Sequence, residues 1–270
     1  MKKRLIMLGA AAFCAFPVFA YDNGNGNSNS CDALPSYGQL KTALVQATND
    51  ESSGLNMNMW GTLVDRDGNV CAVAFTGVNR GAQWPGSRVI SAQKANTANS
   101  FSLDPSAVSG GNGVSLALST ANLFSAVQPG GSLFGLQESN PVDTGVAYKG
   151  PSSNFGTSND PMVGSKIGGV NVFGGGLALY NANHQIIGAI GVSGDTSCAD
   201  HFIAWRARHD LQLDHMKGFI GGVADSDHPD NIIFDITANP DGGAGNSAGG
   251  FGHPKCINTG DPTTLPKVIP

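Results

Sequence analysis

The sequence predicts an α+β domain in which an antiparallel sheet of about five strands carries its helices on one face. Two hairpins supply most of the strands, at residues 59–76 and 177–192. Helical patterns precede the first hairpin, lie between the two hairpins and follow the second, which gives the order αββαα–loop–ββα. Because the two strands of a hairpin are antiparallel, this order indicates an antiparallel sheet rather than a repeated βαβ fold.

The first helix is predicted to begin after Ser36. Ser36 and Gln39 have the spacing of a capping box, in which each side chain accepts a hydrogen bond from the backbone N–H of the other residue. Apolar residues then recur at intervals of three and four, which predicts one buried helix face. They are Leu40, Ala43, Leu44 and Ala47.

The first hairpin turns at Asp67-Gly68, a dipeptide favoured in two-residue turns between antiparallel strands. A helix over residues 87–101 follows, and the residues of its apolar stripe are mostly small, so it can lie close against a sheet. A shorter helix is predicted over residues 114–127.

Residues 128–169 are rich in Gly, Pro, Ser and Asn, and we expect a long surface loop with one short strand near residues 132–136. In the second hairpin, three glycines interrupt the returning strand at Gly188, Gly191 and Gly194, which often marks close approach of another backbone or a ligand. The final helix is predicted over residues 197–211, with Ser197 and Asp200 as its capping box.

The two ends of the chain differ from this core in composition. Residues 1–20 have the basic start, short apolar run and small-residue cleavage site of a signal peptide, with cleavage predicted after Ala20. We therefore expect a periplasmic or secreted protein. Residues 21–35 form a polar leader, 36–215 the packed domain, and 216–270 an irregular C-terminal extension with one strand-like run at 232–236.

Charge and cysteine content narrow the class of partner. The formal net charge is −5 and no basic block occurs outside the predicted signal peptide, which argues against nucleic acid and anionic membranes. No later segment is long and apolar enough to predict a membrane span.

Four cysteines follow the predicted cleavage site, and three pairings are possible. Their places along the chain favour Cys31 with Cys71 and Cys198 with Cys256.

Three motifs together resemble the GlcG/HbpS family of haem-binding or haem-degrading domains. They are DRDGN at 65–69, SAQKANTA at 91–98 and GAIGVSG at 188–194. The resemblance covers residues 36–214, about two-thirds of the chain. It implies a profilin-like sheet, a haem (tetrapyrrole) ligand and a homo-oligomer.

Three residues are candidates for a haem site. His201 is the predicted iron ligand, because imidazole is a common axial ligand and Asp200 beside it can orient the ring. Arg88 and Lys94, on the helix over 87–101, are predicted to bind the propionates. The alternative for His201 is a structural role in the last helix. For Arg88 and Lys94 the alternative is an exposed helix face.

The same pattern leaves other functions open. A non-catalytic sensor or accessory domain would use residues 128–169 and the C-terminal extension as a surface for a protein partner. An enzyme would act on a small organic acid, with Lys94 or Arg88 as the polar anchor. Slow haem degradation is compatible with the family resemblance, so the residues alone leave catalysis undecided.

Overall fold

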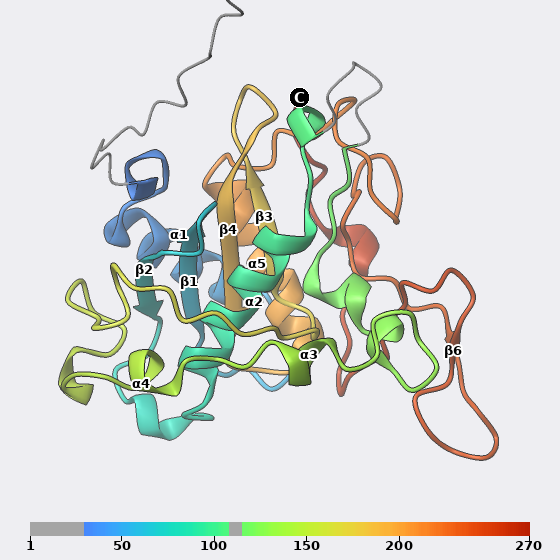
Figure 1. The fold of residues 1–270 in the computed structure, drawn as a ribbon, viewed down its shortest axis with the longest axis horizontal. Helices are drawn as coiled ribbons and strands as arrows, with labels where there is room; N and C mark the ends of the chain where they lie inside the picture. Colours follow the sequence, from blue (N-terminus) through green and yellow to red (C-terminus); the bar gives the residue numbers. More distant parts are fainter. Residues whose placement is uncertain (1–29, 108–114) are drawn as a thin grey trace, which may run out of the picture.

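The main sheet has four strands and is antiparallel throughout. The computed structural model describes residues 30–107 and 115–270. The strands are β1 (Trp60–Asp65), β2 (Val70–Phe75), β3 (Gly176–Tyr180) and β4 (Ile186–Ser193), in the spatial order β2-β1-β4-β3 (Figure 1). The predicted α+β class and both hairpins are confirmed. The sheet has one strand fewer than the five expected, because residues 132–135 form turns and Leu136 begins a short helix.

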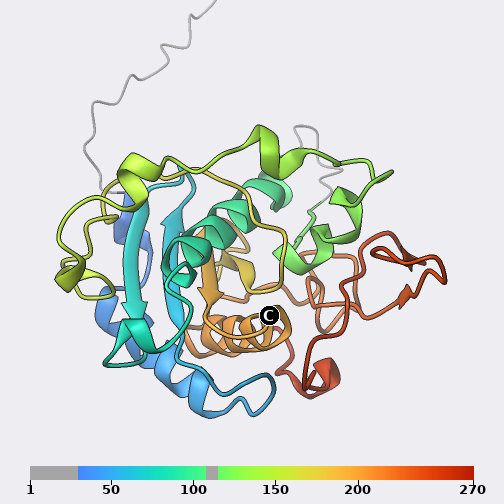
Figure 2. The same ribbon diagram turned by 90° about the horizontal axis from the view of Figure 1, so that it is seen from below.

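Helices cover both faces of this sheet rather than one, which corrects the sequence prediction. Helices α1 (Tyr37–Asn49) and α5 (Ser197–Asp210) pack together on one face, and α2 (Ser87–Phe101) lies across the other (Figure 2). The cause is visible in β1, where alternate side chains enter different cores. Leu63 packs with α1 and α5, and Val64 packs with the alanines of α2.

The local signals at the turns and helix starts are confirmed in most places. Ser36 and Gln39 form the capping box of α1, and Gly68 adopts a φ of 80° in the turn between β1 and β2. Helix α2 spans the predicted residues 87–101. At α5 the cap is one residue earlier than predicted, because the Thr196 side chain accepts a hydrogen bond from the Ala199 N–H.

The segment between α2 and the second hairpin contains no long helix in its described part. The helix predicted over residues 114–127 is replaced by two 3₁₀ turns, η4 (Thr120–Leu123) and η5 (Ser125–Val127). Residues 116–118 are extended instead, because Leu116 pairs with Leu103 and Ala117 pairs with Gly222. The later elements are α3 (Leu136–Ser139), α4 (Thr144–Ala147) and η6 (Ser152–Asn154); η2 (Arg80–Ala82) and η3 (Pro105–Ala107) flank α2.

The C-terminal extension packs into the core while containing little regular structure. Its short elements are β5 (Ile236–Thr237), β6 (Asn246–Ser247) and η7 (Pro262–Thr264), so most of the strand predicted at 232–236 is absent. Its buried apolar residues join the cluster under α1 and α5; they are Met216, Ile220, Ile232, Leu265 and Val268. A buried ion pair between Arg208 of α5 and Asp230 of the extension also links the extension to the domain.

Both favoured disulfides are present. Cys31–Cys71 joins the 3₁₀ turn η1 (Ser30–Ala33) to β2, and Cys198–Cys256 joins α5 to the extension, with Cα separations of 5.4 and 6.0 Å.

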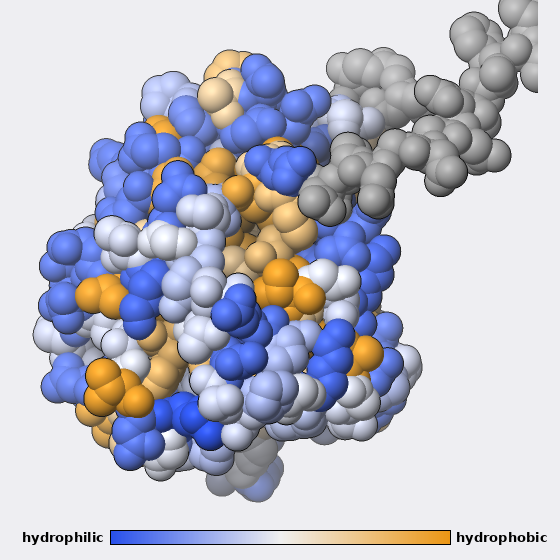
Figure 3. Space-filling view, turned by 90° about the vertical axis from the view of Figure 1, so that its left-hand side faces the viewer, coloured by the Kyte–Doolittle hydropathy of each residue, from blue (hydrophilic) through white to orange (hydrophobic). Residues whose placement is uncertain are grey.

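Figure 3 shows that the face on the β2 side carries apolar residues in small groups among hydrophilic ones. In the described ranges, no helix has the length and apolarity needed to cross a bilayer. The predicted signal peptide and most of the leader lie outside the described residues.

Candidate functional site

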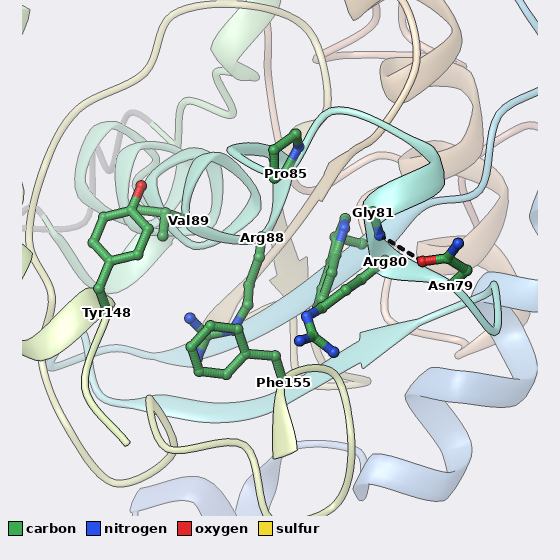
Figure 4. A pocket seen from close by; sticks show the side chains of 9 residues that line it. Asn79, Arg80, Gly81, Pro85, Arg88, Val89, Tyr148 and Phe155 are labelled. Carbon is green, nitrogen blue, oxygen red and sulfur yellow. Dashed lines mark hydrogen bonds between the residues drawn. The ribbon is translucent and has the colours of Figure 1, made fainter. Parts of the chain in front are cut away.

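A pocket of about 380 Å³ opens beside the N-terminal end of α2 (Figure 4). Its walls come from β1, from the segment that leads into α2, and from two residues of the long segment between the hairpins. The lining residues are Trp60, Asn79, Arg80, Gly81, Pro85, Arg88, Val89, Tyr148 and Phe155. Tyr148 and Arg80 lie on opposite sides of the pocket.

Local hydrogen bonds hold one wall of this pocket in place. Asn79 caps the 3₁₀ turn η2, and its side-chain oxygen accepts a hydrogen bond from the Gly81 N–H at 3.0 Å (Figure 4). Asx residues favour such turns because their side chains replace a backbone acceptor. The cap therefore fixes the backbone of Arg80 at the rim.

Arg88 is buried behind the pocket and already has a carboxylate partner. Its Nε donates to Asp160 at 2.8 Å, a second guanidinium nitrogen pairs with the other carboxylate oxygen, and Nη1 donates to the Ala147 carbonyl at 2.7 Å. Its guanidinium lies 3.7 Å from the centre of the Phe155 ring. Arg88 is thus not on an exposed helix face, and its propionate role stays a prediction that requires this ion pair to open.

Arg80 differs from Arg88 in having no carboxylate partner among the described residues. It is exposed, and its only hydrogen bond within the described residues is to the Ser152 hydroxyl at 3.0 Å. The buried Trp60 Nε1 beside it also has no partner in the described structure. An unpaired cation next to aromatic walls suits a flat apolar molecule that carries a carboxylate.

Lys94 lies in the interior and joins helices on opposite faces of the sheet. Its Nζ donates to Asp200 at 2.7 Å and to the Val192 carbonyl at 3.1 Å. Burial lowers the pKa of Lys94, and burial raises the pKa of Asp200 to about 6 against the opposing pull of the Lys94 charge. Lys94 therefore links α2 to α5 through an ion pair. Propionate binding by Lys94 stays a prediction.

His201 is fully buried on α5. Its Nε2 accepts a hydrogen bond from the Ile232 N–H at 3.1 Å, and its Nδ1 has no partner among the described residues. Burial, followed by the nearby Arg208 charge, lowers the pKa of His201 to about 3, so the ring is neutral near pH 7. Iron ligation by His201 stays a prediction and requires the core around α5 to open. Asp200 pairs with Lys94 rather than with this ring.

The structure therefore brings Lys94, Asp200 and His201 into one buried region and places Arg88 behind a separate surface pocket. Sequence reasoning missed Arg80 and Tyr148. The signal for Arg80 was its position between a turn-forming Asn and Trp84-Pro85. Tyr148 lies in a segment without periodicity, so its place at the pocket depends on long-range packing.

The chain is similar to several solved structures. Klebsiella pneumoniae protein ORFY is 26% identical, with 64% of this chain and 86% of that chain covered and a TM-score of 0.40. A PduOC–haem complex is 22% identical, with coverages of 64% and 89% and a TM-score of 0.41. A double mutant of Streptomyces reticuli HbpS is 14% identical, with coverages of 75% and 97% and a TM-score of 0.39.

No curated protein matches the chain. The model of the family described as "Haem degrading protein HbpS-like" matches residues 39–209. This match covers all four strands of the main sheet, α2 and most of α1 and α5. The chain belongs to the HbpS-like family.

Proposed function

We propose that the protein binds haem in the pocket at the N-terminal end of α2, with Arg80 binding a propionate. The observation that carries this proposal is the guanidinium of Arg80 on the wall of an aromatic-lined pocket, where its one side-chain partner in the described residues is the uncharged Ser152 hydroxyl. Haem is flat, largely apolar and carries two carboxylates, so its chemistry matches such a wall. Membership of the HbpS-like family supports haem as the ligand.

The pocket's size determines how the ligand would lie. Its volume of about 380 Å³ is near the lower end for small-molecule sites, which start at roughly 300 Å³. We therefore expect one part of the macrocycle to enter the pocket and the rest to extend over its rim. Tyr148, which lines the pocket and is 56% exposed, supplies aromatic surface there.

The residues support binding more directly than turnover. None of the nine described lining residues carries a carboxylate or an imidazole, the groups that most often serve as general acids and bases. The proposed function is therefore haem binding, with the tetrapyrrole as ligand. Export to the periplasm or outside the cell is part of the proposal, and the two disulfides support it.

A hemin titration followed by absorbance tests the proposal. The wild-type protein is expected to give a saturable, near-stoichiometric Soret band. Arg80→Ala is expected to weaken binding by about tenfold or more, because a charge-assisted hydrogen bond contributes about 1.5–3 kcal/mol. Arg80→Lys keeps the charge without the bidentate geometry and is expected to fall between the two.

Lys267→Ala is the matched control, since it removes an exposed surface cation outside the pocket. Its affinity for hemin is expected to equal that of the wild type. Equal binding by wild type and Arg80→Ala would place the ligand elsewhere. Absence of a saturable band in the wild type would reject haem binding.

A further inference from the structure

We infer that Tyr148 supplies a ligand to the haem iron through its phenolate oxygen, and that its hydroxyl proton leaves to solvent when the iron–oxygen bond forms. This inference rests on the proposed haem site and adds the ligand that the site otherwise lacks. Protein-bound haem iron is held by His, Cys, Met or Tyr side chains. Tyr148 is the one residue of these four types that lines the described pocket.

The Tyr148 hydroxyl is free to bind. The side chain is 56% exposed, and its oxygen makes no hydrogen bond with the described residues. The other tyrosines in the described ranges differ in this respect. Tyr37 donates its hydroxyl to the Gly156 carbonyl, and Tyr180 is fully buried.

The backbone at Tyr148 is held by buried contacts. Tyr148 caps the C-terminal end of α4, and its N–H donates to the carbonyls of Thr144 and Val146. The preceding residue, Ala147, is buried and its carbonyl accepts the hydrogen bond from Arg88. The Arg88–Asp160 ion pair thus acts as a positioning element for the ligand, while Arg80 across the pocket binds the propionate.

The other ligand types lie elsewhere. None of the six histidines lines the pocket; they are His184, His201, His209, His215, His228 and His253. All four cysteines in the described ranges are in disulfides. No methionine of the described chain lines the pocket either. A haem in this pocket is therefore left with the phenol oxygen of Tyr148.

The choice of ligand predicts a spectroscopic signature. A phenolate is an anionic oxygen ligand, so the ferric haem is expected to be high-spin and to show iron–phenolate bands in resonance Raman spectra. An imidazole ligand gives neither these bands nor their shift on labelling of tyrosine. The state of the iron ligand is thus measurable without any assay of turnover.

The test compares hemin complexes of the purified wild type, Tyr148→Phe and Tyr148→His by absorbance, resonance Raman and electron paramagnetic resonance. The wild type is expected to show iron–phenolate bands. Tyr148→Phe is expected to lose these bands and to bind hemin about tenfold more weakly, a loss of ~1.4 kcal/mol. Tyr148→His is expected to show imidazole ligation at the same position.

Tyr37→Phe is the matched control, because it removes a phenol that does not line the pocket. It is expected to keep the iron–phenolate bands. Haem binding with unchanged spectra in Tyr148→Phe would overturn the inference and leave the proposed function standing. No saturable hemin binding in the wild type would overturn both. Circular dichroism and thermal unfolding of each variant test whether its fold is intact.

Discussion

At the scale of single residues, glycines set how closely α2 approaches the sheet. A Cβ on Gly191 would lie 1.9 Å from the Ser91 carbonyl oxygen and 2.5 Å from the Ala95 nitrogen, both backbone atoms of α2. A Cβ on Gly175 would lie 2.4 Å from the Val192 carbonyl oxygen and 3.0 Å from the Asp200 Cβ. These positions accept no side chain because the nearest atoms opposite them belong to the backbone of α2 and of β4.

Gly191→Ala is expected to lower the free energy of unfolding by about 3 kcal/mol, because α2 would have to move away from β4. Urea unfolding at equilibrium measures this loss. The matched control is Gly38→Ala in the exposed first turn of α1, where the nearest atom to an added Cβ is 4.0 Å away. This variant is expected to gain about 0.5–1 kcal/mol. Equal effects would contradict the close approach of α2.

Two buried histidines make stability depend on pH. Burial lowers the pKa of His201 to about 3 and of His253 to about 4, from an ordinary value of 6.5. Both rings are neutral in the folded protein at pH values where the unfolded chain binds protons. The contribution of these neutral rings to the free energy of unfolding is therefore fully present above pH 6.5. It is lost as the pH falls towards 3–4.

The free energy of unfolding is expected to fall between pH 6 and pH 4 by up to about 1.4 kcal/mol per pH unit for each buried histidine. Urea midpoints across this range measure the slope. His201→Gln is expected to be less stable at pH 7 but to show a shallower slope. His184→Gln, which changes a ring that is only partly buried, is the control. An unchanged slope in His201→Gln would contradict the assignment.

At the scale of elements, two of the three long helices begin at a side-chain cap, whereas α2 begins after Gly86 without one. Helix α1 has the full capping box, and Thr196 caps α5. Asp200, predicted as part of the α5 cap, is instead buried in the ion pair with Lys94 and accepts a hydrogen bond from the Asp195 N–H. Asp200 has the spacing of a capping residue, but it forms a long-range ion pair because the buried Lys94 lies beside it.

Thr196→Ala is expected to cost about 1 kcal/mol of unfolding free energy, because it leaves the first N–H groups of α5 without their side-chain acceptor. Ser197→Ala is the matched control and is expected to change stability by less than about 0.5 kcal/mol. Thermal unfolding followed by circular dichroism distinguishes the two. A larger loss in Ser197→Ala would favour the cap predicted from the sequence.

At the scale of the whole molecule, the C-terminal extension is joined to the sheet domain by several independent contacts. Cys198–Cys256 and the buried Arg208–Asp230 pair both connect it to α5. Its apolar residues share the core of α1 and α5, so α5 is covered on the side that faces away from the sheet. The extension is part of the folded unit even though it contains few regular elements.

Replacing both Cys198 and Cys256 by Ser is expected to lower the free energy of unfolding by about 3–4 kcal/mol, since the disulfide restricts the unfolded chain over a long loop. Hydrogen exchange measured by mass spectrometry is expected to increase mainly in residues 216–270. The control replaces Cys31 and Cys71 by Ser, and its increase is expected near the start of α1. Unchanged exchange in the extension would show that apolar packing alone holds it.

Much of the fold was predictable from short-range patterns. The first hairpin, α1, α2 and the body of α5 depend on turn residues, caps and apolar spacing within one element. The disulfide pairing also followed from the order of elements. Predictions were wrong for the helix at 114–127 and the strand at 132–136, where residues 116–118 pair with distant segments and residues 131–135 form turns around two glycines.

The sequence by itself determined the α+β class, the hairpins and long helices, and the family resemblance, because these depend on residues only a few positions apart. The tertiary structure decided which charged residues are free. Arg88 and Asp160 are 72 positions apart, and Lys94 and Asp200 are 106 apart, so no local pattern marks either pair. Charges buried this deeply require a partner, and packing left Arg80, rather than Arg88 or Lys94, available to a ligand.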